Sequence, residues 1–151
     1  LALGAMYEQD GNLPQARRIY EQALAAIPNL WPAANNLAFI LSEHAGNTAD
    51  LDKSLTLARQ AQRSRPDDPA VMDTLGWVYF RRGEVLSAQA AIQSALDKDP
   101  QNAIFNYHMG MILARTGKKA AAVERLQTAL KSDTAFPGRV EAETALKRIQ
   151  L

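Results

Sequence analysis

Cysteine is absent from this chain of 151 residues. Disulfide bonds, thiolate nucleophiles and cysteine-ligated zinc sites are therefore excluded, although the absence fits a reducing and an oxidising compartment equally well. No apolar run approaches the roughly 18 residues typical of a membrane-spanning helix. Runs of β-branched residues, which favour strands, are missing too. The last of these absences favours helices over strands.

An excess of either charge is lacking, since 17 basic side chains stand against 16 acidic ones and the formal net charge is +1. The basic pairs Arg17-Arg18, Arg81-Arg82 and Lys118-Lys119 are scattered among acidic residues. A nucleic-acid site needs a concentrated basic patch that displaces counterions from the phosphate backbone. The sequence therefore predicts no nucleic-acid partner.

Signatures of catalysis are also lacking. There is no phosphate-binding glycine loop, no His-x-x-x-His pair and no serine in a nucleophile elbow. The two histidines, His44 and His108, are far apart, and a metal site or catalytic dyad would require them to converge with a carboxylate. We interpret His44 as lying near a helix end and His108 as packing or lining a groove. The chain is predicted to be no enzyme and to hold no cofactor and no metal.

What the sequence does contain is an internal repeat. Its first motif occurs three times, as Leu3-Gly4-x-x-Tyr7, Leu75-Gly76-x-x-Tyr79 and, more loosely, Met109-Gly110-x-x-Leu113. Gly76 and Gly110 are 34 residues apart, which is the period of a two-helix solenoid repeat. A solenoid buries its core by stacking each repeat on the next, and it offers a binding surface in place of a catalytic pocket.

Turn residues and prolines divide the chain into helices. Pro28, Pro66 and Pro100 follow every second helical segment, and proline cannot continue a helix. The segments between them are rich in Ala, Leu, Gln, Arg and Glu, which favour helices. The predicted helices lie near 1–10, 14–27, 32–45, 50–64, 69–82, 86–98, 103–116, 119–131 and 138–150.

Small residues recur at fixed positions of these helices. One column on the first helices contains Gly4, Ala38, Gly76 and Gly110, and one on the second helices contains Ala16, Ala88 and Ala122. Two helices approach to about 8–10 Å only where the side chains at the crossing are small. The columns are therefore predicted to be the sites of closest helix packing.

The pattern resembles the tetratricopeptide repeat. The motifs that carry the resemblance are Leu3-Gly4-x-x-Tyr7, Ala16-x-x-x-Tyr20 and Pro28 in the first unit, and Leu75-Gly76-x-x-Tyr79, Ala88-x-x-x-Ile92 and Pro100 in the third. The resemblance implies an all-α, right-handed solenoid of antiparallel helix pairs. We expect units near 1–30, 31–68, 69–102 and 103–136, followed by a capping helix in 137–151. Members of the family mostly bind proteins or peptides in a concave groove, and they are rarely enzymes.

The second unit departs from the period, because Pro66 comes four residues late. We expect the extra turn in 46–53, either as a lengthened turn or helix end, or as a loop that contacts a partner. The fourth unit has Thr134 where the column predicts proline.

The last helix is predicted to direct its apolar side chains to one side and to pair Glu143 with Lys147. The apolar side chains are Val140, Ala142, Ala145, Leu146 and Ile149. It is interpreted as a cap, with the start of a further repeat as the alternative.

The family geometry places a set of first-helix residues in the groove, at spacings of three or four within each helix. The predicted partner-binding residues are Asn35, Phe39, Ser42, Glu43, Asp73, Trp77, Phe80, Arg81, Tyr107, Met111 and Arg115. Trp77 and Phe80 are interpreted as surplus to scaffold packing, so Trp77→Ala is expected to weaken binding without unfolding the protein. The alternative is that Trp77 and Phe39 pack against the preceding repeat.

Two narrower hypotheses concern the partner. The clamp with which some family members grip a terminal carboxylate is not expected, because only Asn36 fits its pattern. Asn35-Asn36-Leu37-Ala38 and 73–77 are similar to bacterial family members linked to exopolysaccharide export and surface-protein sorting, which favours a periplasmic or membrane-tethered parent.

The chain begins inside a repeat without an initiator methionine, and it is expected to be a fragment of a longer protein. The alternative to a partner-binding scaffold is a structural module that self-associates through the apolar face at Leu1, Leu3 and Met6.

Overall fold

The computed structural model describes residues 1–133 and 135–151, and in this part of the chain the regular elements are nine α-helices. Their bounds are α1 (Ala2–Gln9), α2 (Leu13–Ala26), α3 (Trp31–Glu43), α4 (Thr48–Ser64), α5 (Pro69–Arg81), α6 (Val85–Lys98), α7 (Ala103–Arg115), α8 (Lys119–Leu130) and α9 (Arg139–Gln150). Every predicted helix is present, with ends within two residues of the predicted ones. The all-α prediction is confirmed.

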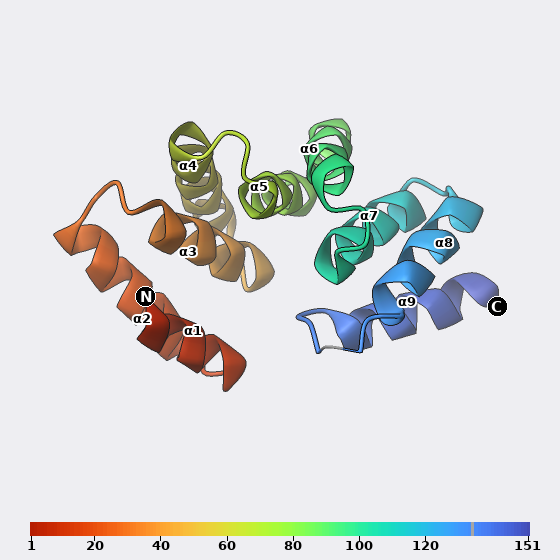
Figure 1. The fold of residues 1–151 in the computed structure, drawn as a ribbon, viewed down its shortest axis with the longest axis horizontal. Coiled ribbons are helices and arrows are strands. Elements are labelled where there is room, and N and C mark those ends of the chain that lie inside the picture. The colour runs from red at the N-terminus through yellow and green to blue at the C-terminus, as the bar shows by residue number, and fades with distance from the viewer. Residues whose placement is uncertain (134) are drawn as a thin grey trace.

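The helices pack as consecutive pairs that form an arch (Figure 1). Each of α1, α3, α5 and α7 packs against the helix that follows it, and α3, α5, α7 and α9 also contact one another in sequence. In Figure 1, α4 and α6 lie on the outer side of the arch, whereas α1 and α9 lie at its two feet. The inner side is therefore built mainly from first helices.

Asparagine and aspartate side chains begin several of these helices. Asn47 accepts a hydrogen bond from the Asp50 backbone N–H at 3.0 Å, and Asp68 accepts one from Ala70 at 3.0 Å. These caps satisfy backbone donors that have no partner inside the helix. The turn between α5 and α6 contains Gly83, whose backbone φ of 82° is rarely adopted by residues other than glycine.

The column of small residues marks the closest approach within each pair. A Cβ added at Gly76 would lie 2.5 Å from Cγ1 of Ile92, and one at Gly110 would lie 2.7 Å from Cγ of Leu126. In the second unit the column holds Ala38, and its partner is the smaller Ser54, whose hydroxyl donates to the Ala38 carbonyl at 2.6 Å. The sizes of the two facing residues are thus matched in each pair.

The extra turn of the second unit lies in the C-terminal half of α4, so its predicted position in 46–53 is wrong. Ser54 faces Ala38 at a separation of 16 residues, as Ile92 faces Gly76. The four added residues therefore follow Ser54, and α4 has 17 residues where α2 and α6 have 14. Because four residues make about one helical turn, Ala58 and Ala61 still face the core.

Helix α9 packs against α7 and α8 and covers the end of the last pair. Ala142 is fully buried, but Val140 is 70% exposed and does not belong to the packed face as predicted. Val140 lies in the first turn of α9. Glu143 lies 3.6 Å from Arg139, one turn before it, and not beside the predicted partner Lys147. The expected proline position, Thr134, lies outside the described residues.

We predict that Gly76→Ala lowers the free energy of unfolding by about 1–3 kcal/mol, because the new Cβ overpacks the contact with Ile92. This loss exceeds the gain of about 1 kcal/mol that alanine brings to a helix. Urea denaturation of Gly76→Ala, Ile92→Ala and the double variant measures the coupling.

In the double variant both facing residues are small, as they are in the Ala38 and Ser54 pair. Its loss of stability should fall short of the sum of the two single losses by about 0.5–3 kcal/mol. Additive losses would mean that the two side chains do not limit how closely α5 and α6 approach.

Candidate partner-binding groove

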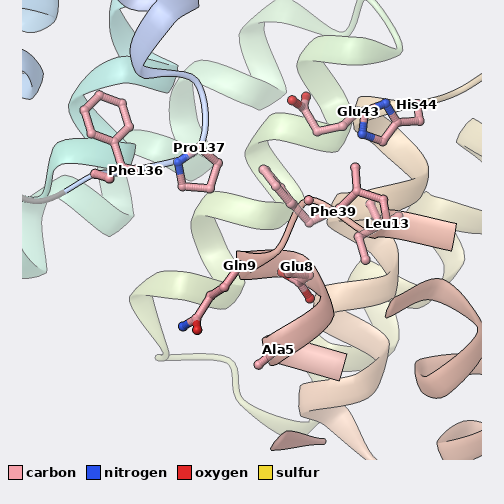
Figure 2. Close-up of a pocket in the computed structure, with 12 residues that line it drawn as sticks. Ala5, Glu8, Gln9, Leu13, Phe39, Glu43, His44, Phe136 and Pro137 are labelled. Carbon is pink, nitrogen blue, oxygen red and sulfur yellow. The ribbon is translucent and has the colours of Figure 1, made fainter. Parts of the chain in front are cut away.

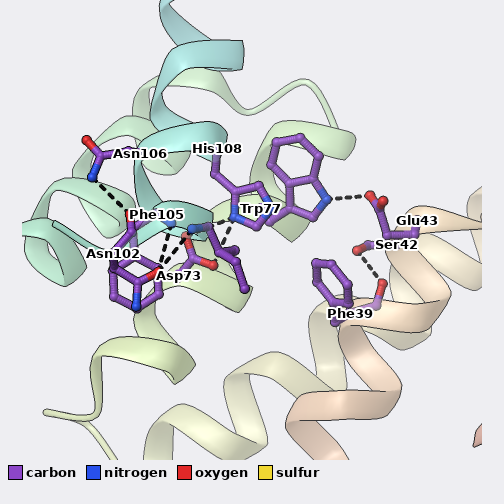
Figure 3. Close-up of polar contacts among 10 residues, drawn as sticks. Phe39, Ser42, Glu43, Asp73, Trp77, Asn102, Phe105, Asn106 and His108 are labelled. Carbon is purple, nitrogen blue, oxygen red and sulfur yellow. Dashed lines mark hydrogen bonds and ion pairs between the residues drawn. The ribbon is translucent and has the colours of Figure 1, made fainter. Parts of the chain in front are cut away.

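The inner side of the arch carries a cluster of aromatic rings around Trp77 (Figure 3). The Trp77 ring is stacked on His108, with centroids 4.0 Å apart and an interplanar angle of 17°. Its centroid lies 5.0 Å from that of Phe80 and 5.7 Å from that of Tyr107. These separations are typical of favourable aromatic pairs. The cluster therefore joins α5 to α7.

Two polar contacts tie this cluster to its neighbours (Figure 3). The Trp77 indole N–H donates to Oε1 of Glu43 at 2.6 Å, which links α5 to α3. His108 Nδ1 lies 2.9 Å from both carboxylate oxygens of Asp73, which links α7 to α5. Hydrogen bonds to charged groups contribute about 1.5–3 kcal/mol each. Three successive first helices are thus joined by directional contacts as well as by packing.

The predicted binding residues divide into a buried and an accessible group. Trp77 is 2% exposed and belongs to the core, so the expectation that it is surplus to scaffold packing is wrong. Periodicity placed it on the correct helical face, but α7 covers that face. The other buried members of the predicted set are Ser42, Asp73, Phe80 and Tyr107. The remaining members of the predicted set are half-buried or exposed: Asn35, Phe39, Glu43, Arg81, Met111 and Arg115. That these residues bind a partner stays a prediction.

The connection between α8 and α9 closes the groove over the fourth unit. The Phe136 ring lies 6.0 Å from the Tyr107 ring, and Phe136 is itself buried. Gly138 follows, at a φ of 92°, and any Cβ there would clash with the Tyr107 ring. The chain therefore occupies the space in front of Tyr107, and the accessible part of the inner side lies toward the N-terminus.

That accessible part is a pocket between the first units and the α8–α9 connection (Figure 2). Its volume is about 690 Å³. The lining residues come from α1 to α3 with the turns after α1 and α3, and from the connection: Ala5, Glu8, Gln9, Gly11, Leu13, Phe39, Ile40, Glu43, His44, Ala135, Phe136 and Pro137. Of the predicted set, only Phe39 and Glu43 line it. Pockets of about 300–1,000 Å³ with mostly apolar walls and a few polar groups are typical of binding sites.

Glu8 on the pocket wall is poorly solvated. Burial raises the pKa of the Glu8 carboxyl above its ordinary value, and a hydrogen bond with the Tyr20 hydroxyl opposes this rise. One of its oxygens, Oε1, has no hydrogen-bond partner among the described residues. Burial likewise raises the pKa of Tyr20, and the bond to Glu8 adds to this effect. The pocket therefore has a carboxylate whose charge is only partly compensated.

Sequence reasoning missed four contributors to this region: Glu8, Leu13, His108 as an Asp73 partner, and Phe136. Glu8 and Gln9 stand one period before Ser42 and Glu43, so the repeat itself held the signal for these two residues of the pocket wall. Phe136 precedes Pro137-Gly138, a turn signal in which the bulky apolar residue required a contact. Asn36, the single residue that fits the carboxylate clamp, donates to the Tyr20 hydroxyl at 3.1 Å.

Within the described residues, no three side chains of His, Cys, Asp or Glu gather as metal ligands would. No helix of the described chain has the length and apolar character needed to cross a bilayer.

Comparison with known proteins identifies the repeat. Sequence profiles of the tetratricopeptide repeat match residues 1–30 and 74–146, which together cover more than half of the chain. A thermophilic TPR protein of Thermus thermophilus has the same fold, with a TM-score of 0.76 over 96% of this chain and 78% of that one, at 20% identity.

Two bacterial relatives are much longer than this chain. A TPR repeat-containing protein of Pseudomonas aeruginosa is 27% identical over 97 residues, which are 64% of this chain and 16% of the relative. Cellulose synthase operon protein C of Pseudomonas fluorescens is 27% identical over 151 residues, which span 97% of this chain and 12% of the relative. The chain thus corresponds to less than a fifth of either relative.

We predict that Trp77→Ala lowers the free energy of unfolding by about 3–5 kcal/mol, since it removes a buried ring and its contacts with His108 and Phe80. Urea denaturation measures the loss. Leu86→Ala removes an apolar side chain that is 85% exposed and should change stability by less than about 0.5 kcal/mol. Equal stability of both variants would show that Trp77 is not part of the core.

We predict opposite pH dependences for two glutamates. The raised pKa of Glu8 means that the wild type loses stability relative to Glu8→Gln as the pH rises from below 4.5 to neutral. Partial burial works to raise the pKa of Glu21, but hydrogen bonds from Lys53 at 2.9 Å and Arg17 at 3.2 Å outweigh it and lower that pKa.

The wild type should accordingly gain stability relative to Glu21→Gln over the same pH range. Denaturant titrations at pH 4 and pH 7 test both signs. The same sign for both variants would contradict the environment described for Glu8.

Proposed function

The chain belongs to the tetratricopeptide repeat family, and we propose on that premise that it holds a segment of a partner protein in the pocket on its concave side. The tetratricopeptide fold is generally a protein–protein interaction module, and members of the family are typically non-catalytic scaffolds. The observation that carries the proposal is the pocket of about 690 Å³ between α1–α3 and the α8–α9 connection.

The composition of the pocket wall supports this function. Phe39 is half-buried and presents its ring to the pocket, and Phe136 and Leu13 contribute to the same wall. Aromatic side chains set in a pocket and surrounded by polar groups are the usual centres of binding energy in protein interfaces. Phe39 packs against the aromatic cluster, with its ring centroid 6.1 Å from that of His108, and a wall that is already packed needs little further ordering when a partner binds.

The two bacterial relatives support a wider proposal about the parent protein. One of them is named for a cellulose synthase operon, and this chain covers 12% of its length. We propose that the chain is one interaction segment within a long repeat protein of an exopolysaccharide-producing assembly at the cell envelope.

A second candidate function is self-association. Leu1, just before α1, and Leu3 and Met6 on α1 are 47%, 48% and 59% exposed, which leaves an apolar face at the N-terminal foot of the arch. Such faces favour end-to-end contacts unless another repeat covers them. Light scattering over a concentration series distinguishes the two functions, since a concentration-independent monomer mass excludes strong self-association of this chain.

We predict that Phe39→Ala reduces capture of a partner from an extract of the source organism by roughly thirtyfold, as loss of about 2 kcal/mol at a binding hot spot requires. Wild type and variant serve as paired baits, with circular dichroism to establish that both are folded. A component of an exopolysaccharide-synthesis apparatus among the captured proteins would support the proposed parent assembly.

Leu86→Ala, on the outer side of α6, is the matched control and should capture as the wild type does. Capture that is equal for all three baits would move the interface away from the pocket and contradict the proposal.

A further inference from the structure

The pocket combines an apolar wall with two carboxylates, and its twelve described lining residues include no lysine or arginine; the one basic group among them is the imidazole of His44, beside Glu43. Glu8 lies on the side of α1, and Glu43 lies at the end of α3 (Figure 2). The adjoining hollow reaches Arg17, but that guanidinium is paired with Glu21 at 3.2 Å. With two carboxylates against one imidazole, the pocket presents an excess of negative charge beside an apolar surface.

The charge of Glu43 is fixed in position. Its Oε1 accepts the indole N–H of Trp77 at 2.6 Å, and Trp77 is held by the aromatic cluster. The guanidinium of Arg81, on α5, donates to the backbone carbonyl of Glu43 at 3.4 Å. A carboxylate held in this way needs no further ordering when a ligand binds, so little of its electrostatic attraction to the ligand is offset by a loss of side-chain entropy.

Glu8 adds a second carboxylate, which is less well solvated. Its Oε1 has no partner among the described residues and is shielded from solvent, while Phe39 and Ala5 lie along the same wall. The attraction between a carboxylate and a cation is stronger near such an apolar surface than in bulk water. A cation in the pocket would therefore stabilise the ionised form of Glu8, which the protein itself leaves partly uncompensated.

We propose that the pocket binds a partner segment that places a lysine or arginine side chain beside a large apolar side chain. This inference rests on the proposed function and specifies the partner's chemistry. The apolar side chain packs on Phe39 and Phe136, and the cation lies between Glu8 and Glu43. An acidic segment is repelled by both carboxylates, so the preference is opposite to that of a site that grips a terminal carboxylate.

The test uses three fluorescein-labelled peptides of seven residues, capped at both ends, with a Leu-Phe core beside a lysine, a glutamine or a glutamate. Fluorescence anisotropy measures their affinities at 50 and 500 mM salt. The lysine peptide should bind at least about tenfold more tightly than the glutamine peptide, and the glutamate peptide should bind most weakly. The difference should shrink at the higher salt concentration, because ions screen attraction between exposed charges.

Charge-removing variants identify the groups responsible. In the Glu8→Gln/Glu43→Gln double variant each amide oxygen can still accept the native hydrogen bond, so the wall keeps its shape. The lysine and glutamine peptides should then bind within about twofold of each other. Glu124→Gln removes an exposed acid on α8 outside the pocket, and this control should keep the full preference.

Other outcomes overturn the inference in recognisable ways. Equal affinities for the three peptides, a preference for glutamate, or no binding of any peptide at 1 mM would exclude a cation-selective pocket. A wild-type dimer that dissociates in the double variant would make a second copy of the chain the occupant. Phe39→Ala separates the two proposals: it should weaken all three peptides, and unchanged binding would contradict the proposed function as well.

Discussion

The close approach of paired helices at one column of small residues is the constraint on which the rest of the architecture depends. Gly76 allows α5 to lie against Ile92 of α6, and Gly110 does the same for α7 and Leu126. If these pairs separated, the first helices would no longer lie near enough to share side-chain contacts along the inner side. The Asp73–His108 and Glu43–Trp77 contacts, each spanning two units, therefore exist because the pairs are tight.

Trp77 connects this framework to the pocket without lining it. Its ring is part of the core, yet its N–H fixes the carboxylate of Glu43 on the pocket wall. One residue thus supports packing through its ring and positions a charge through its nitrogen. A prominent aromatic residue on a predicted binding face can therefore be a core residue that shapes the pocket only through its neighbour.

The helices and their pairing could be predicted from the sequence because both follow from local patterns: a period of 34, prolines after every second helix and small residues at fixed positions. The burial of Trp77 could not, since periodicity gives the face of a helix but not what covers it. The pocket could not be predicted from the sequence for a related reason. Glu8 and Phe136 are 128 residues apart, and only the curvature of the arch brings them to one cavity. The extra turn was misplaced because proline spacing records an insertion without locating it, whereas the contact between Ala38 and Ser54 does.

The α8–α9 connection makes the two ends of the inner surface different, because its residues lie against the fourth unit. Phe136 and Gly138 occupy the space before Tyr107, so an extended chain lying along the first helices meets a wall there. A segment that followed the first helices from α3 toward α7 would have to end, turn or leave the surface at this point. Within the described residues the inner surface is therefore interrupted at the fourth unit, where Phe136 and Gly138 take up the space that a continuous row of first helices would leave free.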